Sequence, residues 1–304
     1  MTSTSTAVHR LGGIAGPAIM LLGMFLFALN DAMGKWLVAS YSVGQVVLIR
    51  SIAALLILAP FLWMSGLKPL LKPERPGMQA ARVAFSTFEL FCFYYAVTYL
   101  PLADVMTYWL AAPIYVAALS PFLLGEKVGW RRWSAIAVGF IGVIIALNPS
   151  SAMFTPPAIL SIAGAAAFAF MMLSGRSLRG TPDKTLVFFQ TAGAGLAGLA
   201  MAPFDWRPIA SMEDALLLSL LGIVAMSAHI MVNRALKISD AATVAPLQYT
   251  LLLWAVVFGW YFFGDLPKPS MMLGAALITG AGLFIFFREQ QLKKRDQVLP
   301  AVPE

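Results

Sequence analysis

The chain has 304 residues, of which 60% are hydrophobic and only 12% are charged, and its mean hydropathy is +0.81. Because a soluble domain carries roughly 25% charged residues, this composition excludes an ordinary soluble protein. The single cysteine, Cys92, excludes an internal disulfide, and the two histidines, His9 and His229, lie too far apart for a zinc motif. The net charge is +7, but the basic residues occupy short loops between apolar runs, which indicates membrane orientation rather than nucleic-acid binding.

Apolar runs of spanning length fill the chain, at roughly 20 residues per crossing. Residues 1–13 are short and polar and are predicted to form a cytosolic tail rather than a cleaved signal peptide. About ten runs follow, at 14–38, 44–66, 78–98, 102–124, 131–148, 156–175, 185–204, 215–233, 241–263 and 268–287. Residues 288–304 form a second polar tail. The sequence therefore predicts an all-α polytopic protein whose first partner is the lipid bilayer.

Lys and Arg collect on one side of this predicted topology. That side holds Arg10, Lys68, Lys72, Arg75, Lys127, Arg131, Arg132, Arg176, Arg179, Lys184, Arg234, Lys237, Arg288, Lys293, Lys294 and Arg295, whereas the other side holds Arg207 and Lys268. By the positive-inside rule the basic side is cytoplasmic, so both termini are predicted to face the cytosol.

The chain also repeats itself. Ala96 aligns with Ala235, Ala103 with Ala242, and the turn Gly125-Glu126 with Gly264-Asp265, when residues 14–148 are laid over 156–287. Five spans in each half give the two halves opposite orientations. This arrangement is typical of transporters built from inverted repeats, which hold their substrate near the midplane.

Several motifs together carry a family resemblance: Asn30-Asp31 with Lys35-Trp36, Arg50, the stretch Tyr94-Tyr95-Ala96 to Leu102-Ala103, the turn Gly125-Glu126-Lys127 and the helix Gly139 to Val143. They resemble the EamA type of the drug/metabolite transporter superfamily. Within that superfamily the chain looks most like bacterial riboflavin and S-adenosylmethionine importers. The resemblance implies a secondary transporter of a small metabolite in a bacterial inner membrane. The second acidic turn departs from the family pattern, because Asp265 replaces the expected Glu.

Charged residues inside spans are candidates for a proton or substrate pathway, because a lone charge at the bilayer centre costs roughly 2.5 to 3.5 kcal/mol. Asp31 and Lys35 are four residues apart and share a helical face, so either they form a structural ion pair or they line the pathway. Arg50 must find a carboxylate, a carbonyl cluster or a substrate anion, and Asp31 and Asp104 are its candidate partners.

A polar stripe follows the third span. Arg82, Ser86, Glu89 and Phe93 recur at helical spacing, and Glu89 is the most deeply placed carboxylate. A buried carboxyl could bind a proton on one side of the membrane and release it on the other. The alternative is a structural Glu that is protonated or paired with an arginine.

An aromatic stripe follows the fourth span, where Tyr108 and Tyr115 flank two alanines and Trp109 lies beside them. Such a recess would accept a flat ring, although membrane aromatics more commonly serve packing or interfacial belts. Gln248 and Tyr249 of the ninth span are candidates for the opposite wall. The substrate-binding residues predicted from the sequence are therefore Tyr108, Trp109, Tyr115, Gln248 and Tyr249.

The glycine run Gly193 to Gly198 matches a dinucleotide fingerprint in form, but it lies inside an apolar span and predicts close helix packing instead. No Walker sequence indicates direct use of ATP, and no cofactor or metal is expected. The near absence of His and Cys argues against a membrane enzyme. The leading expectation is riboflavin uptake; S-adenosylmethionine, amino-acid or drug transport by the same fold is the alternative, and the possibility of a homodimer is left open.

Overall fold

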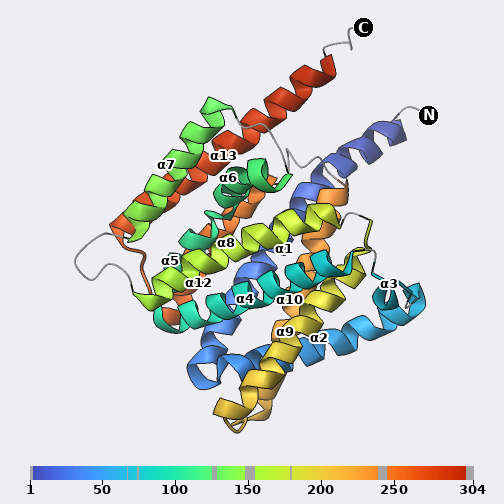
Figure 1. Cartoon of the computed structure of the whole chain (residues 1–304), viewed down its shortest axis with the longest axis vertical. Coiled ribbons are helices and arrows are strands. Elements are labelled where there is room, and N and C mark those ends of the chain that lie inside the picture. Colours follow the sequence, from blue (N-terminus) through green and yellow to red (C-terminus); the bar gives the residue numbers. More distant parts are fainter. Residues whose placement is uncertain are drawn as a thin grey trace.

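The computed structural model describes residues 3–66, 68–73, 75–124, 129–147, 155–178, 180–238 and 245–298, and every regular element within them is helical. Figure 1 shows the elements, which are α1 (Ser3–Ser40), α2 (Val43–Ser65), α3 (Lys68–Leu71), α4 (Pro76–Tyr99), α5 (Leu102–Trp109), α6 (Ala112–Leu124), α7 (Trp130–Leu147), α8 (Pro156–Ser177), α9 (Asp183–Met201), the 3₁₀ turn η1 (Ala202–Asp205), α10 (Met212–Ile238), the 3₁₀ turn η2 (Ala245–Tyr249), α12 (Thr250–Phe263) and α13 (Pro269–Val298). The predicted all-α class is confirmed.

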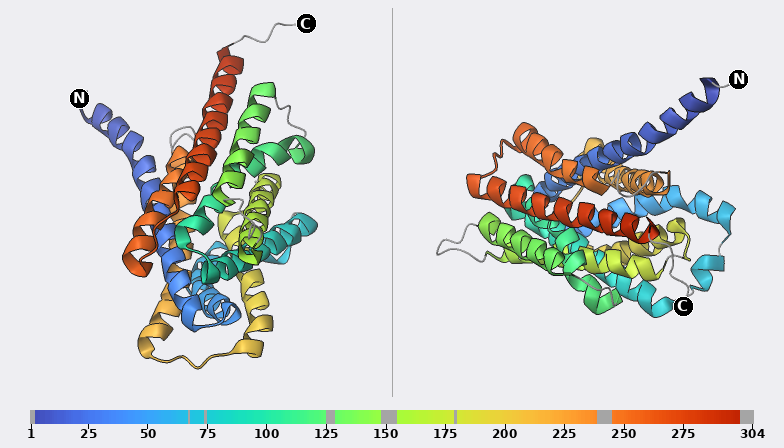
Figure 2. Two further views of the ribbon diagram at one scale, coloured as in Figure 1. Left: turned by 90° about the vertical axis from the view of Figure 1, so that its left-hand side faces the viewer. Right: turned by 90° about the horizontal axis from the view of Figure 1, so that it is seen from above.

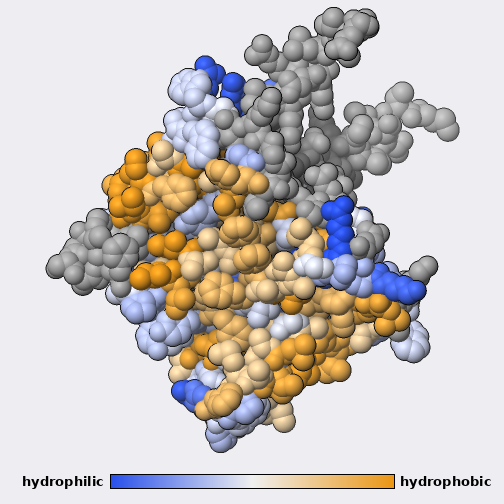
Figure 3. Space-filling model, viewed as in Figure 1, coloured by the Kyte–Doolittle hydropathy of each residue, from blue (hydrophilic) through white to orange (hydrophobic). Residues whose placement is uncertain are grey.

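Within the described ranges, six helices are long and apolar enough to cross a membrane: parts of α1, α2, α8, α9, α10 and α13. Three shorter apolar segments lie at Leu102–Val116, Trp133–Ala146 and Leu247–Phe263. α4 has 24 residues, but its polar stripe lowers its mean hydropathy below that of these helices. Apolar side chains cover most of the visible surface, and hydrophilic residues gather towards its edges (Figure 3). The protein is therefore a multi-pass membrane protein.

The predicted run 102–124 is broken into α5 and α6. The break falls at Leu110 and Ala111, where the Leu110 N–H is bonded to Met106 and the Ala111 N–H to Tyr108. Pro113 follows directly, and a proline supplies no backbone donor and disfavours helical geometry in the residue before it. The run 241–263 is interrupted in a comparable way, because η2 precedes α12.

Helices from the two halves of the sequence pack against each other in pairs. The most extensive packing joins α1 to α10, α4 to α8, α2 to α9 and α7 to α13, and each of these pairs crosses the boundary between the halves. Figures 1 and 2 show α7 and α13 side by side, and they show both chain termini at one end of the molecule. We call the opposite end the distal end; it holds the α1–α2 corner and the α9–α10 loop.

Glycines allow the closest helix approaches. Gly193 lies against Val83 of α4, and Gly198 lies against the α2 backbone at Gly44 and Leu48. A Cβ at Gly198 would come within 2.7 Å of the Leu48 amide nitrogen, a contact that side chains do not tolerate. The prediction that the Gly193–Gly198 run serves close helix packing is confirmed.

Candidate functional site

Polar side chains from four helices meet in the interior and form what we call the central cluster. Its members are Asn30 and Asp31 of α1, Arg50 of α2, Glu89 and Tyr94 of α4, and Trp109 of α5. Three hydrogen bonds connect them: Asn30 Nδ2 donates to Asp31 Oδ1 at 3.0 Å, Trp109 Nε1 donates to Glu89 Oε1 at 3.1 Å, and Arg50 Nη1 donates to the Tyr94 hydroxyl.

Small residues position Arg50 and Tyr94. The Arg50 guanidinium lies over the Tyr94 ring, with 5.6 Å between Cζ and the ring centroid. Gly222 of α10 lets the Arg50 backbone approach closely, and Gly34 of α1 leaves room for the fully buried Tyr94 ring. Among the described residues Arg50 is therefore held by a phenol and makes no direct ion pair.

Arg50 also acts electrostatically on both carboxyl groups of the cluster. Asp31 and Glu89 each lie within interaction range of Arg50, and Glu89 is within range of Asp31. The sequence-based expectation that Asp31 is a partner of Arg50 is supported at this longer range. Asp104, the other expected partner, interacts instead with Lys35, Asp265 and Lys268.

The Glu89 carboxylate is oriented by Trp109. The Trp109 ring packs edge-on against Phe93, with 5.5 Å between centroids, and Gly164 of α8 leaves space for it. Because the indole has only one N–H and that group bonds Glu89, Trp109 fixes one carboxylate oxygen. Trp109 therefore belongs to the polar centre rather than to an open aromatic wall.

A second group of charges, the distal cluster, consists of Lys35, Asp104, Asp265 and Lys268. Lys35 Nζ donates to Asp265 Oδ2 at 2.6 Å and to the Leu100 carbonyl at 3.3 Å, and it lies 4.6 Å from the Phe263 ring centroid. Lys35 thus joins α1 to the α4–α5 corner and to the end of α12. Of the two alternatives for Asp31 and Lys35, the ion pair is not formed among the described residues, because the Lys35 ammonium group bonds Asp265.

Further hydrogen bonds fasten the α1–α2 corner to the α9–α10 loop, and we call them the distal clasp. Buried Gln45 donates through Nε2 to the Arg207 carbonyl at 2.7 Å and accepts from the Arg207 N–H at 3.1 Å. The Tyr41 hydroxyl donates to Asp214 Oδ2 at 2.6 Å and accepts from the Ala210 N–H at 3.1 Å. The bond to Asp214 raises the pKa of Tyr41, so the phenol remains a proton donor.

The remaining aromatic candidates lie together in an apolar cluster. Tyr108 and Tyr115 are buried among side chains of α5, α6, α7, α8 and α13, and Tyr249 packs against the same cluster. The Tyr249 hydroxyl lies where a Cβ on Gly282 would stand, and it has no hydrogen-bond partner among the described residues. The structure brings these three tyrosines together, but as packed neighbours.

Other candidates are less informative. Gln248 is half-buried in η2, and His229 of α10 packs edge-on against Phe27 with 4.7 Å between ring centroids. The Gly125-Glu126 turn lies outside the described residues.

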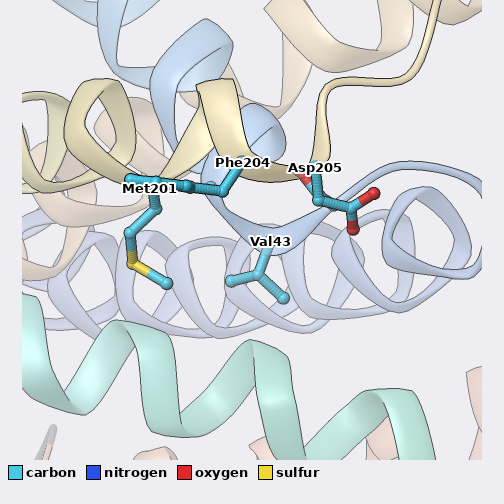
Figure 4. Close-up of a pocket in the computed structure, with 6 residues that line it drawn as sticks. Val43, Met201, Phe204 and Asp205 are labelled. Carbon is cyan, nitrogen blue, oxygen red and sulfur yellow. The ribbon is translucent and has the colours of Figure 1, made fainter.

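A shallow hollow of about 250 Å³ opens at the distal end and is lined by Ser42, Val43, Gly44, Met201, Phe204 and Asp205. Figure 4 shows the Val43 and Met201 side chains close together, with the Asp205 carboxylate directed away from them. This hollow shares no residue with the central cluster.

The structure adds two glutamines that the sequence analysis did not single out. Gln45 anchors the distal clasp, and Gln79 is 5% exposed on α4, where neither of its amide atoms has a partner among the described residues. Gln79 lies three residues before Arg82, so an extension of the polar stripe by one turn would have found it. Gln45 carries no comparable signal, because its partner is backbone.

An all-helical, lipid-facing bundle with charged groups gathered inside is the architecture of a membrane transporter. Comparison with known families makes the assignment specific. The chain matches the EamA-like transporter family over residues 14–148 and again over residues 155–287, so it belongs to that family. The family consists of transporters, in agreement with the expectation that the chain is not an enzyme.

Curated relatives carry two substrate names. The chain is 28% identical to the S-adenosylmethionine uptake transporter of Rickettsia prowazekii, over 89% of this chain and 92% of that protein. It is also 28% identical to the riboflavin transporter of Rhizobium johnstonii, over 97% and 98% of the two chains, and 26% identical to the riboflavin transporter of Vibrio cholerae, over 93% and 97%. These relatives support transport of a small metabolite.

A solved crystal structure shares the fold. It superposes with a TM-score of 0.58, covering 90% of this chain and 98% of its own, at 18% sequence identity.

Proposed function

We propose that the protein is a secondary transporter with ten spans in two inverted halves, formed by residues 14–148 and 156–287. Two observations support this layout. The first is that the family match occurs twice. The second is that interchanging the two halves maps the packed helix pairs onto one another: the α1–α10 pair corresponds to the α8–α4 pair, and the α2–α9 and α7–α13 pairs each join equivalent helices. Such an exchange is expected of a two-fold axis in the membrane plane.

The proposed orientation places both termini in the cytosol of a bacterium, with the distal end facing the periplasm. The Lys and Arg distribution supports it, because only Arg207 and Lys268 lie in the distal loops. Reporter fusions after Pro149 and Arg207 should read periplasmic, and one after Arg179 cytosolic. A cytosolic reading after Pro149 would contradict this topology.

The proposed transport site is the central cluster, and its charge balance supports a cationic substrate. Two carboxyl groups, Asp31 and Glu89, face a single guanidinium, Arg50. With both carboxylates ionised, one negative charge is left over in an environment that stabilises isolated charges poorly. A cationic centre of the substrate that binds within this cluster would neutralise it.

S-adenosylmethionine has such a centre, because its sulfonium carries a positive charge in addition to its zwitterionic amino-acid head. Trp109 supplies an aromatic face beside Glu89, and aromatic faces attract cations by about 0.5 to 2 kcal/mol. The excess of carboxylates over basic groups in the central cluster is the observation that favours S-adenosylmethionine, or a related adenosyl cation, as the leading substrate candidate.

Riboflavin is the second candidate, and the near-complete coverage of the Rhizobium johnstonii relative favours it. For a neutral flavin, the walls of the binding site would be formed by Tyr108, Trp109, Tyr115, Gln248 and Tyr249. The excess negative charge of the central cluster would then be neutralised by a proton. Opening of the packed tyrosine cluster is required for this alternative.

Uptake of labelled S-adenosylmethionine and labelled riboflavin into cells expressing the protein, with protein level in the membrane measured in parallel, tests both candidates. Saturable accumulation of S-adenosylmethionine that unlabelled riboflavin does not compete for supports the first. Rescue of a riboflavin auxotroph on low riboflavin, without S-adenosylmethionine uptake, would replace it with the second. Accumulation of neither would contradict both substrate assignments.

A further inference from the structure

The half of α4 nearer the chain termini carries polar groups that nothing in the described structure satisfies. Arg82 Nη2 makes one long hydrogen bond, 3.5 Å to Gln190 Oε1 of α9. Its Nε and Nη1 atoms are buried and have no partner among the described residues, and the same holds for both amide atoms of Gln79. Arg82 and Gln79 are three residues apart and therefore share one face of α4.

Buried polar groups without a hydrogen-bond partner are energetically unfavourable. Leaving a buried polar group without a hydrogen bond costs about 1 to 3 kcal/mol, and a charged group costs more. A leucine or methionine at either position would avoid this cost. Buried polar groups normally make hydrogen bonds. Exceptions that bring no structural benefit are expected at functional sites.

The unsatisfied groups lie on the same stripe as the central carboxylate. Gln79, Arg82, Ser86 and Glu89 follow one helical face, and Ser86 between them is satisfied by the Val83 carbonyl at 3.0 Å. Seven residues separate Arg82 from Glu89, a rise of roughly 10.5 Å along the helix. His229 of α10 lies within electrostatic range of both Arg82 and Arg50, which places Arg82 beside the same polar interior.

Neighbouring contacts fix the direction of this face. Phe85 stacks on Phe170 of α8, with 5.0 Å between ring centroids, and Val83 packs on Gly193 of α9. α4 therefore cannot turn its stripe towards lipid without losing both contacts. Arg82 therefore stays on the side of α4 that faces Gln190 of α9.

We infer that Gln79, Arg82 and Gln190 form a subsite for the carboxylate of the transported substrate. A guanidinium presents donors in planar forks that match a carboxylate. The free Nε of Arg82 forms such a fork with the second N–H of Nη2, and the free Nη1 offers a further donor on the other edge. The Gln79 amide adds a further donor one turn away. This inference rests on the proposed function: the cationic centre of the substrate binds near Asp31 and Glu89, and its carboxylate binds at Arg82.

The subsite defines the substrate class as a small metabolite that carries a carboxylate as well as a cationic centre, such as an amino-acid head group joined to a sulfonium. Riboflavin has neither group. Flavin mononucleotide has an anionic phosphate but no cation, so it distinguishes a carboxylate subsite from a phosphate subsite.

The experiment measures equilibrium binding to the full-length protein in lipid nanodiscs, with labelled S-adenosylmethionine as the probe and its decarboxylated analogue as competitor. The wild-type protein should prefer the carboxylate-bearing form by about tenfold or more, the equivalent of one charge-assisted hydrogen-bonded pair. Arg82→Gln should reduce this preference to about twofold or less, and Arg82→Lys should give an intermediate value because it keeps the charge without the fork. Arg131→Gln, which removes an exposed arginine stacked on Trp130, should keep the full preference.

The results that would overturn the inference can be distinguished from one another. Equal binding of the two compounds by the wild-type protein, or an unchanged preference in Arg82→Gln, would exclude the carboxylate subsite while leaving the transporter proposal intact. Binding of flavin mononucleotide that depends on Arg82 would replace carboxylate by phosphate, and binding of neither adenosyl compound would overturn the proposed substrate as well.

Thermal unfolding separates a binding role from a structural one. Arg82→Gln and the second variant Gln79→Leu should melt at the wild-type temperature or above it, because each removes an unsatisfied buried group. A fall in melting temperature in both variants, together with an unchanged preference for the carboxylate, would assign Arg82 to the architecture of the helix bundle.

Discussion

The distal clasp, together with the Lys35–Asp265 pair, and the interior of α4 differ in how their polar groups are paired, although Asp104 Oδ1 of the distal cluster has no partner among the described residues. At the distal end Lys35 is paired with Asp265, Gln45 is bonded twice to Arg207, and Tyr41 is bonded to Asp214 and Ala210. Within α4, Gln79 and Arg82 have atoms without a partner among the described residues, and Glu89 receives one hydrogen bond from Trp109. Pairing between helices therefore holds the distal end together, whereas the unpaired groups of α4 are the ones that we propose to bind the substrate.

Glu89→Gln is the variant with the largest expected effect, because it removes a central charge and keeps the size of the side chain. Loss of one partner in a desolvated charge pair costs about 2 to 5 kcal/mol, so uptake should fall by about tenfold or more. Initial uptake rates per membrane-inserted protein, measured at several pH values, provide the readout.

Glu213→Gln is the matched control, since Glu213 is exposed at the start of α10. It should transport at the wild-type rate. Unchanged accumulation and pH dependence in Glu89→Gln would make Glu89 a structural residue and would remove the contrast between the two regions.

Reversal of the distal ion pair should have a smaller effect. The Lys35 and Asp265 side chains are 14% and 28% exposed, so solvent screening limits their coupling energy to about 1 kcal/mol, or roughly fivefold. Lys35→Asp and Asp265→Lys should each slow uptake, and the double variant should recover most of the loss. Failure of the double variant to recover would show that Lys35 or Asp265 acts on the substrate rather than on its partner.

Gln45→Leu tests the distal clasp through stability rather than transport. It removes two hydrogen bonds and leaves the Arg207 N–H and carbonyl unpaired, so the free energy of unfolding should fall by about 1 to 3 kcal/mol. Uptake per folded molecule should stay within about twofold of wild type. Gln291→Leu, at an exposed position of α13, provides the amide control and should leave the unfolding free energy unchanged.

Tyr249→Phe should have the smallest effect, because the hydroxyl has no partner among the described residues. Both the free energy of unfolding, within about 0.5 kcal/mol, and the uptake rate should remain at wild-type values. Tyr249→Ala should destabilise by about 3 to 5 kcal/mol through the cavity it leaves. A tenfold loss of uptake in Tyr249→Phe alone would place the hydroxyl against the substrate and would favour the aromatic-wall alternative.

Periodic and compositional features were open to prediction from the sequence. Apolar runs gave the helical class and the membrane environment, because lipid requires every spanning backbone group to be bonded within its own helix. The Gly193–Gly198 run was correctly predicted to pack helices, and the spacing of Arg82, Ser86 and Glu89 placed them on one face of α4. Each of these features depends on neighbours within a few residues, which sequence spacing encodes directly.

The partners of the polar groups depended on tertiary structure. Helical spacing allowed an ion pair between Asp31 and Lys35, but the packing of α12 against α1 brings Asp265 to within 2.6 Å of the Lys35 ammonium group. The sequence predicted Trp109 as part of an aromatic wall, but the packing of α4 and α5 places Glu89 beside its indole N–H. The tyrosines expected to form a recess are packed against α7, α8 and α13. Sequence spacing limits which face of a helix a side chain occupies, whereas the choice of partner is made by helices that are distant in sequence and meet only in the folded bundle.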